Sequence, residues 1–305
     1  MEIKTVSIIG LGALGILFGN HLNKSMPRGD LRIIADRERI IRYEKDGITC
    51  NGEPCDFSYR TPEETGAPAD LILFAVKYND LADAVKAVRN QVGEQTVILS
   101  LLNGITSEEI IAGAYGKEKV LDCVAQGMDA VKEGNRLRYT HMGMICFGQI
   151  ADRGPAENIE RVRAFFEKTG VPHEVVDDMG RRMWGKLMVN VGVNQTVAVC
   201  GETYGDIQKE GRARDTMIAA MREVVELSRK EKIFLSEEDL QYWLDILNTL
   251  SPEGKPSMRQ DVEAKRPSEV ELFAGTVISL GEKHKVPTPV NRWLYDKVKD
   301  MESKY

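Results

Sequence analysis

Residues 5–15 read Thr-Val-Ser-Ile-Ile-Gly-Leu-Gly-Ala-Leu-Gly, a short apolar run that ends in a GxGxxG motif. The run predicts a buried strand, and the motif is where the following helix should begin. Gly10 permits a tight turn, Gly12 lets the backbone approach a pyrophosphate, and Gly15 lets the helix pack closely on the strand. Because a helix N-terminus offers free amides to an anion, the stretch favours a dinucleotide-binding fold over a merely structural glycine turn. The expected cofactor contacts are Gly10, Gly12, Ala13, Leu14 and Gly15.

Strands and helices alternate after this motif. We expect strands at 31–35, 71–76 and 96–101, with helices at 37–46 and 79–91. This rhythm predicts a parallel sheet covered by helices on both faces. Ligands bind outside the carboxyl ends of such strands, so the polar residues that follow them are candidates: Asp36, Arg37, Lys77 and Asn103. For Lys77 the alternative is a solvated loop residue, and Asn103-Gly104 is also a common turn dipeptide.

Residues 120–150 change to short strands with turns, which predicts an antiparallel extension of the sheet. A loop beginning at Asp152 should lead into a helix, and residues 174–176 form a candidate edge strand. Beyond this point the pattern is helical. We therefore place the domain boundary between an α/β domain at 1–177 and a helical domain at 178–305.

The second domain opens with residues 181–199, an almost wholly apolar stretch in which Lys186, Asn190 and Asn194 recur every fourth residue. A helix places the three side chains on one stripe of roughly 12 Å. A strand, which the valines also allow, would spread them over about 26 Å, too far to converge on one small molecule. Burying such groups without partners costs about 1–3 kcal/mol or more each, so we expect the stripe to face a polar cavity or a ligand. The alternative is a solvated lysine, with asparagines that bond neighbouring helices.

Gly185 and Gly192 lie inside this expected helix, where each costs about 1 kcal/mol relative to alanine. We take them to indicate the close approach of another group. Ser268 and Glu271 match a capping box, which would make Glu269 a first-turn acid favoured by the helix dipole. The further helices are expected at 210–230, 236–250, 268–284 and 289–301.

The composition bounds the class of protein. The chain has 305 residues, of which 42% are hydrophobic and 29% charged, as in an ordinary soluble protein of two domains. Its net charge of -6 argues against nucleic acid or an anionic membrane as the main partner. No apolar run approaches the roughly 20 residues of a membrane span, and the first strand starts too early to leave room for a signal peptide. Five cysteines without a CxxC pair favour a reduced, cytoplasmic setting and no metal site.

Several of these motifs occur together, in order, over essentially the whole chain. In this respect the sequence resembles the ketopantoate reductases, also called 2-dehydropantoate 2-reductases. No single motif is specific, but the ordered set is. The resemblance rests on Gly10–Gly15, Val76-Lys77, Leu102–Gly104, His141–Gly143, Trp184–Leu187 with Asn190 and Asn194, Ser257–Val262, Ser268-Glu269 and Val286–Leu294.

This resemblance implies a Rossmann domain and a C-terminal all-helical domain of the 6-phosphogluconate dehydrogenase C-terminal type. It implies that NADPH reduces 2-dehydropantoate to pantoate in the cleft between the domains, a step of pantothenate and coenzyme A biosynthesis. Lys186 would be the general acid, supported by Glu269, and Lys77 would meet the cofactor near its nicotinamide. The substrate would be held by Asn103, Asn190, Asn194 and Ser257, with Asn103 also near the cofactor. The chemistry agrees, because hydride addition leaves negative charge on the carbonyl oxygen, which an ammonium can stabilise and protonate.

The sequence departs from the family pattern at two positions. Tyr204 stands where some members have a substrate-side asparagine, and Gln195 replaces a proline that often follows Asn194. We expect both to lie near the pocket, which leaves the exact small 2-keto acid open. One alternative is a related dehydrogenase that acts on another 2-keto acid, on a hydroxyacid or on glycerol 3-phosphate. Another is an NADPH-binding sensor without turnover. The oligomeric state is also open, with a homodimer as one option.

The end of the second expected strand bears on cofactor choice. An acid at the position of Asp36 usually bonds the ribose 2′-hydroxyl of NAD and repels a 2′-phosphate. Arg37 follows at once, and Arg39 is close behind. A guanidinium could grip the phosphate bidentately if Arg37 turned inward. The family resemblance leads us to expect NADP(H), with NAD(H) as the alternative. A simpler interpretation of these charged residues is that they only begin a surface helix.

Overall fold

The computed structural model describes residues 2–150 and 155–305, so the loop expected at Asp152 lies outside the described residues. The chain separates into two compact units, Met1–Met179 and Gly180–Tyr305. Across the part of the chain that is described, we find no helix that is both long and apolar enough to span a membrane.

Within the described residues, the first unit is built on an eight-stranded sheet. Across the sheet, the neighbouring strands from β5 (Tyr59–Arg60) to β8 (Val120–Met128) are all parallel. Strand β8 pairs antiparallel with β11 (Met142–Gly148), which confirms the expected extension. The edge strand expected at 174–176 is also present and pairs with β11. Across the sheet the order is β12 (His173–Val176), β11 (Met142–Gly148), β8 (Val120–Met128), β7 (Val97–Ser100), β6 (Leu71–Phe74), β1 (Val6–Ile9), β2 (Leu31–Ile34) and β5 (Tyr59–Arg60).

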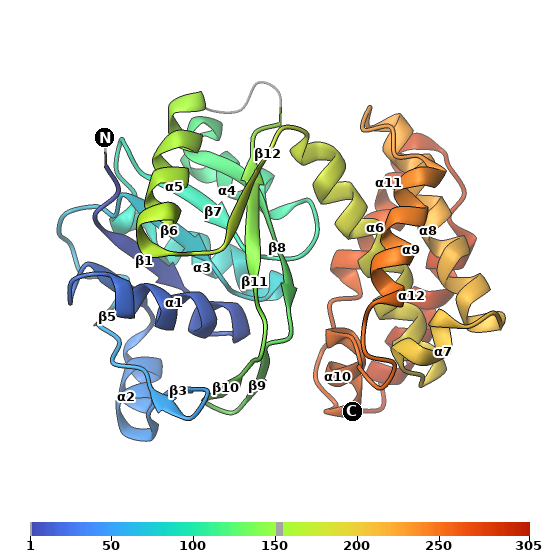
Figure 1. Ribbon diagram of the computed structural model, residues 1–305, viewed down its shortest axis with the longest axis horizontal. Helices are drawn as coiled ribbons and strands as arrows, with labels where there is room; N and C mark the ends of the chain where they lie inside the picture. Colours follow the sequence, from blue (N-terminus) through green and yellow to red (C-terminus); the bar gives the residue numbers. More distant parts are fainter. Residues whose placement is uncertain (1, 151–154) are drawn as a thin grey trace. The chain divides into compact units, whose positions relative to one another are not determined.

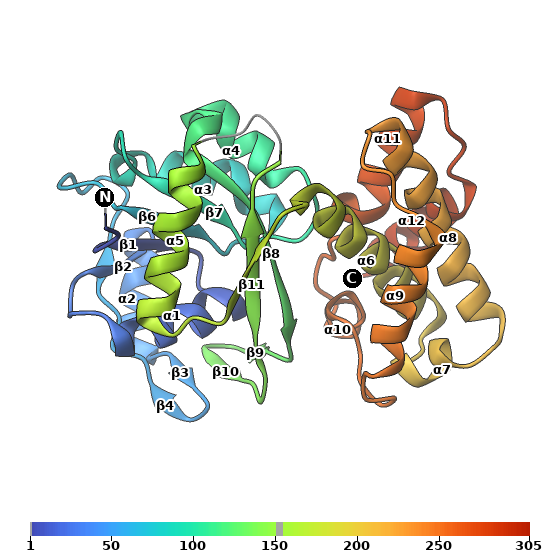
Figure 2. The same ribbon diagram turned by 45° about the horizontal axis from the view of Figure 1, so that its top comes forward.

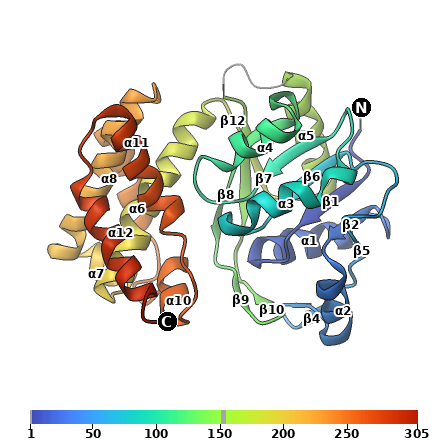
Figure 3. The same ribbon diagram turned by 180° about the vertical axis from the view of Figure 1, so that it is seen from behind.

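Helices cover both faces of this sheet, as predicted. Figures 1 and 3 show α1 (Ala13–Ser25) and α5 (Ala156–Thr169) on one face, and α3 (Leu81–Ala87) and α4 (Ser107–Tyr115) on the other. Successive side chains of a strand point to opposite faces. Leu73 accordingly belongs to the same core cluster as Phe166 of α5, whereas the next residue, Phe74, clusters with Leu81 of α3.

The register of the strands brings their carboxyl ends to one edge. Ile9 lies opposite both Ile34 and Phe74, and Phe74 lies opposite Ser100. After β1 the chain moves outward to β2 on one side and later returns to β6 on the other. This reversal of strand order is the topological switch point at which doubly wound sheets bind their ligands.

Several short elements of the first unit give no periodic signal in the sequence. The helix expected at 79–91 is broken into η1 (Tyr78–Asp80), α3 and η2 (Arg89–Gln91), and neither α4 nor η3 (Lys117–Lys119) was expected. By contrast, α2 (Arg37–Asp46) has the predicted bounds. Strands of two or three residues are too short to show alternation, and four of them form a small second sheet. Its order is β4 (Glu53–Pro54), β3 (Thr49–Cys50), β10 (Arg136–Arg138) and β9 (Val131–Glu133).

The second unit is helical in its described residues. The stretch 181–199 lies within one helix, α6 (Met179–Cys200), so the strand alternative is wrong. Figure 2 shows that α8 (Arg212–Lys230), α9 (Glu237–Asn248) and α12 (Pro289–Glu302) lie near α6. Two short helices, α7 and α10, were not expected. The elements are α6 (Met179–Cys200), α7 (Tyr204–Gln208), α8 (Arg212–Lys230), α9 (Glu237–Asn248), α10 (Ser257–Glu263), the π-helical turn η4 (Glu271–Gly275), α11 (Thr276–His284) and α12 (Pro289–Glu302).

The two glycines of α6 mark close contacts with neighbouring helices. A Cβ at Gly185 would lie 2.5 Å from Nε1 of Trp243 in α9, and a Cβ at Gly192 would lie 2.5 Å from Cγ of Met221 in α8. The close approach inferred from the sequence is therefore made by other helices, not by a ligand. Glycine is needed there because any larger residue would overlap its neighbour.

The capping box expected at Ser268 and Glu271 is wrong. The backbone N and the Oγ of Ser268 both donate to Oε1 of Glu302, at 2.8 and 2.7 Å. The side chain of Glu271 instead accepts a hydrogen bond from Tyr295 Oη at 2.7 Å. Ser268 and Glu271 therefore bond Glu302 and Tyr295 of α12, far away in the sequence, and not each other. The helix begins at Glu271 with a π turn.

Gly192→Ala should lower the free energy of unfolding by about 1–3 kcal/mol, the usual cost of overpacking a core. The added Cβ would also lie 3.0 Å from the backbone oxygen of Met217, which cannot rotate away. Gly113→Ala is the control, because a Cβ at this exposed position of α4 meets nothing within 4 Å. It should stabilise the protein by roughly 0.5–1 kcal/mol. Urea denaturation measures the free energy of unfolding of both variants. Equal changes in the two would mean that Gly192 is not required by the packing of α6 against α8.

Candidate functional site

The glycine-rich loop between β1 and α1 packs directly against the chain that follows β6. Gly10 has φ +94°, and a Cβ there would lie 2.6 Å from Val76 Cγ1. A Cβ at Gly15 would lie 1.9 Å from the carbonyl oxygen of Gly10. At Gly12 the nearest atom would be Ala75 O, at 3.3 Å. Gly10 and Gly15 are therefore required by packing, whereas Gly12 leaves room beside the helix N-terminus.

Gly12 is also the N-cap of α1, and it has no side chain to bond the first amides of the helix. These N–H groups have no partner within the helix itself, and the helix dipole adds partial positive charge at the same end. The first turn, which begins at Ala13, can therefore donate to an anion such as a phosphate.

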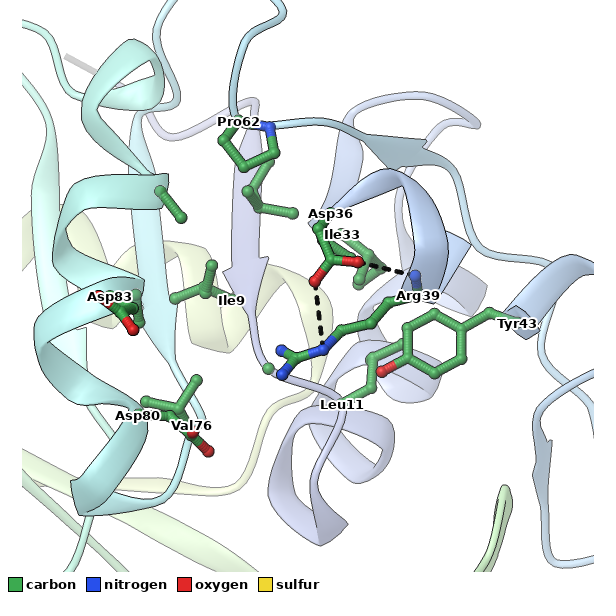
Figure 4. Close-up of a pocket in the computed structure, with 15 residues that line it drawn as sticks. Ile9, Leu11, Ile33, Asp36, Arg39, Tyr43, Pro62, Val76, Asp80 and Asp83 are labelled. Atoms are coloured by element: carbon green, nitrogen blue, oxygen red, sulfur yellow. Dashed lines mark hydrogen bonds and ion pairs between the residues drawn. The ribbon is translucent and has the colours of Figure 1, made fainter. Parts of the chain in front are cut away.

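A pocket of about 230 Å³ opens beside this loop (Figure 4). It lies at the switch point, between the ends of β1, β2 and β6. Pockets for whole drug-sized ligands usually measure about 300–1,000 Å³, so this one fits one part of a dinucleotide, such as an adenosine, and not the whole. Its lining includes Gly10, Leu11, Ala35, Asp36, Arg39, Tyr43, Val76, Asp80 and Ala84.

Asp36 and Arg39 supply opposite charges to this pocket. Asp36 is the N-cap of α2, and its Oδ1 accepts a hydrogen bond from the backbone N of Arg39 at 2.8 Å. Its Oδ2 lies 3.3 Å from Nε of Arg39, and both side chains are about half exposed, at 54% and 52%. Figure 4 shows Arg39 extending from α2 into the pocket. Arg37 is exposed and does not line it.

Arg39 and Tyr43 are pocket residues to which the sequence assigned no role. The signal was present, since they lie three and seven residues after the N-cap Asp36 and thus share one face of α2. Lys77 and Asn103 lie farther along the same sheet edge. Lys77 is exposed after β6, and Asn103 is half buried after β7.

Three of the expected substrate residues come together in the second unit. Asn194 Nδ2 donates to Asn190 Oδ1 at 3.3 Å, as expected for side chains one helical turn apart. Asn194 Oδ1 in turn accepts from Ser257 Oγ and from the backbone N of Met258, each at 3.3 Å. Asn194 thus holds the first turn of α10 against α6, so part of its role is structural.

Asn190 keeps an unused donor. Its Nδ2 is buried and has no hydrogen-bond partner among the described residues. Leaving a buried amide donor unpaired costs about 1–3 kcal/mol, so such a group is a good candidate to meet a ligand. Lys186, half buried, lies one helical turn before it on the same stripe.

Glu269 lies half buried just before the π-helical turn η4. Its carbonyl oxygen accepts from the backbone N of Phe273 at 3.1 Å. Because the helix begins only at Glu271, Glu269 is not the first-turn acid that the capping-box interpretation required. Its position on a turn leaves the carboxylate outside the regular helix.

Gln195 lies in the core of the helical unit. It is fully buried, and its Nε2 donates to Val191 O at 2.8 Å and to Asn291 Oδ1 at 3.1 Å. Its Oε1 accepts from the backbone N of Ala274 at 3.1 Å. A helix turns by about 100° per residue, which carries Gln195 away from the stripe of Asn194 and into the helical core.

Tyr204, the other departure, is half buried, and its backbone N donates to Gly254 O at 3.0 Å. Burial raises the pKa of Tyr204 to about 12, so its phenol stays protonated at neutral pH. Among the described residues, no group of three His, Cys, Asp or Glu side chains is placed to hold a metal ion.

Comparisons with known proteins agree with this architecture. The family described as "Ketopantoate reductase PanE/ApbA" matches residues 6–152, and its C-terminal counterpart matches residues 178–302. The 2-dehydropantoate 2-reductase of Aquifex aeolicus is 25% identical over 97% of this chain and 96% of its own length. That of Archaeoglobus fulgidus is 27% identical over 99% of each chain.

Solved structures show the same fold. D-mandelate dehydrogenase with NADH and anilino(oxo)acetate has a TM-score of 0.87 at 21% identity, over 98% of this chain and 99% of that one. The 2-dehydropantoate 2-reductase from Geobacter metallireducens GS-15 has a TM-score of 0.84 at 25% identity, over 97% and 99%. A dimeric ketopantoate reductase from Staphylococcus aureus has a TM-score of 0.80 at 20% identity, over 98% of this chain and 99% of that one. Since the two family models together match most of its length, the chain belongs to the ketopantoate reductase family of NAD(P)-dependent oxidoreductases.

Proposed function

We propose that this enzyme reduces 2-dehydropantoate to pantoate with NADPH, a step of pantothenate and coenzyme A biosynthesis. The observation that carries the proposal is the buried donor of Asn190, which no described residue pairs, on the same helical stripe as Lys186. A polar substrate would complete this stripe. The relatives from Aquifex aeolicus and Archaeoglobus fulgidus are named for the same reaction, which supports the choice of substrate.

Each unit has its own part in the proposed reaction. The first unit binds the cofactor, with the pyrophosphate at the N-terminus of α1 and Lys77 and Asn103 toward the nicotinamide. The bound cofactor supplies the hydride. In the second unit, Lys186 donates a proton to the carbonyl oxygen as negative charge develops on it. Glu269 supports this lysine and bonds the substrate hydroxyl, while the substrate is held by Asn103, Asn190, Asn194 and Ser257.

The proposed roles follow the domain division drawn from the sequence. The nucleotide-binding domain is 1–177 and the substrate domain 178–305, within two residues of the division between the compact units at Met179 and Gly180. A homodimer and a cytoplasmic location stay predictions; the dimeric relative supports the first.

For the cofactor, we propose that Arg39 binds the 2′-phosphate of NADPH. Its Nε faces Asp36, so the two terminal nitrogens of the guanidinium can form the bidentate pair that a phosphate prefers. The same ion pair reduces the repulsion between Asp36 and a phosphate. Arg37, the residue first expected to do this, is less suited because it does not line the pocket. NADH is the rival, with Asp36 bonding the ribose hydroxyls.

Lys186→Ala should lower kcat for 2-dehydropantoate by about 100- to 10,000-fold, the usual contribution of general acid catalysis. Cofactor affinity should change little, because the lysine acts on the carbonyl. Absorbance of the reduced nicotinamide measures turnover, first across a panel of 2-keto acids to identify the preferred substrate. The control is Lys209→Ala, which removes the charge of an exposed lysine. If Lys186→Ala keeps the wild-type kcat, Lys186 is not the general acid. If the unmodified protein turns over no 2-keto acid, the alternative of an NADPH-binding sensor is favoured.

Gly12→Val should abolish binding of NADPH while the protein stays folded. Its Cβ would lie 3.3 Å from Ala75 O, a tight contact but without the overlap found at Gly10 and Gly15, and the branched side chain would fill the space beside the helix N-terminus. Calorimetric titration with NADPH measures binding, and circular dichroism checks the fold. Gly15→Ala provides the contrast, because its Cβ would clash at 1.9 Å with Gly10 O and should unfold the loop itself. Undiminished binding by Gly12→Val would mean that the loop is only structural.

Arg39→Ala should lower kcat/KM for NADPH by about 10- to 100-fold, the worth of hydrogen bonds to a charged group, and change that for NADH much less. Arg37→Ala is the matched control and should change neither kcat/KM by more than about 2-fold, because Arg37 does not line the pocket and surface substitutions away from a site usually have small effects. Steady-state kinetics with both cofactors separate the outcomes. If only Arg37→Ala lowers kcat/KM for NADPH selectively, Arg37 and not Arg39 binds the 2′-phosphate. If the unmodified enzyme prefers NADH, Asp36 is the residue that selects the cofactor.

A further inference from the structure

We propose that Gln195 is a positioning residue for Glu269: it ties the π-helical turn that follows Glu269 to the helix that carries Lys186, Asn190 and Asn194. The inference rests on the proposed function, since it concerns the role given there to Glu269. All of the contacts that carry it lie within the unit Gly180–Tyr305.

The π turn leaves one backbone amide to be bonded from outside. Phe273 N donates to Glu269 O at 3.1 Å, and Gly275 N donates to Val270 O at 3.0 Å. In a regular α-helix the carbonyl of Val270 would accept from Ala274, which lies between these two donors. Because Gly275 has taken that carbonyl, the amide of Ala274 donates to Oε1 of Gln195 at 3.1 Å. Both Ala274 and Gln195 are fully buried, so water cannot substitute.

A chain of hydrogen bonds sets the orientation of the Gln195 amide. A carboxylate can only accept, and Oε2 of Glu223 accepts from Nδ2 of Asn291 at 2.7 Å. This leaves Oδ1 of Asn291 to accept from Nε2 of Gln195 at 3.1 Å. The Oε1 of Gln195 is then directed to Ala274. Asn291 is also fully buried, so which group donates and which accepts is fixed at each step from Glu223 to Ala274.

This chain joins the two parts of the proposed site in the second unit. Gln195 follows Asn194 directly in α6, and the turn that it bonds accepts its first hydrogen bond at the carbonyl of Glu269. Losing the bond would let the turn relax toward a regular helix and shift Glu269 relative to α6. A displacement of about 1 Å in a catalytic group can cost about 100-fold in rate.

The first variant is Gln195→Met, which keeps the length of the side chain but has no comparable acceptor for Ala274. We expect kcat to fall by about 10- to 100-fold with KM for NADPH unchanged. Thr196→Val is the matched control, because Thr196 is the next residue of α6, is fully buried, and has an Oγ1 without a hydrogen-bond partner among the described residues. Wild-type kcat in Gln195→Met, or an equal loss in Thr196→Val, would overturn the inference.

A double-mutant cycle separates positioning from general damage to the fold. If Gln195 acts through Glu269, then Gln195→Met should cost kcat little once Glu269→Gln is present, whereas independent effects would multiply. Multiplying losses would overturn the inference. A Glu269→Gln variant with full kcat would instead remove the role of Glu269 from the proposed function. A loss in Glu269→Gln with none in Gln195→Met would leave that function standing and refute the positioning role alone.

Gln195→Glu tests the hydrogen bond even if Gln195→Met folds poorly. A protonated carboxyl keeps both an acceptor for Ala274 and a donor for Asn291, and burial raises the pKa of such a group. Its kcat should therefore approach that of the wild type at low pH and fall as the carboxyl ionises at higher pH, unlike the wild-type profile run in parallel. A pH profile of the same shape as the wild type, at reduced kcat throughout, would overturn the inference.

Discussion

The contact between the glycine-rich loop and the chain after β6 is the constraint on which the first unit depends. There is no space for a Cβ at Gly10 or Gly15, so the start of α1 sits directly against the sheet. This close contact places the N-terminus of α1 at the reversal of strand order, where the ends of β1, β2 and β6 meet. The proposed phosphate site and the pocket beside it are thus consequences of the same packing.

In the second unit, α6 has a comparable central role, but it divides its residues among three tasks. Gly185 and Gly192 let two neighbouring helices approach, and the apolar residues fill the core. The polar stripe is left to bind Ser257 through Asn194 and to present the unpaired donor of Asn190. An unpaired polar group in a buried helix lowers the stability of the protein. Here that group is Asn190, on the stripe where the reaction is proposed to occur.

The Asp36 and Arg39 pair illustrates how a charged pocket can stay adaptable. At about half exposure their mutual attraction is screened by solvent and worth little for stability. Its value lies in geometry, because the N-cap bond holds Asp36 at the end of β2 while Arg39 reaches over the pocket. Acceptor and donor groups are therefore both available in the pocket proposed for the adenosine end of the cofactor.

The sequence by itself determined the elements with local causes. The GxGxxG turn, the parallel strands around it, α2 and the helical nature of 181–199 follow from backbone sterics and from apolar periodicity, which act over a few residues. The tertiary structure decided what depends on distant partners. Ser268 bonds Glu302 and not a local capping residue. The glycines of α6 pack against Trp243 and Met221, and Gln195 is buried where it bonds the amide of Ala274. Such partners lie tens of residues away along the chain, so no local pattern records them, and only folding brings their donors and acceptors together.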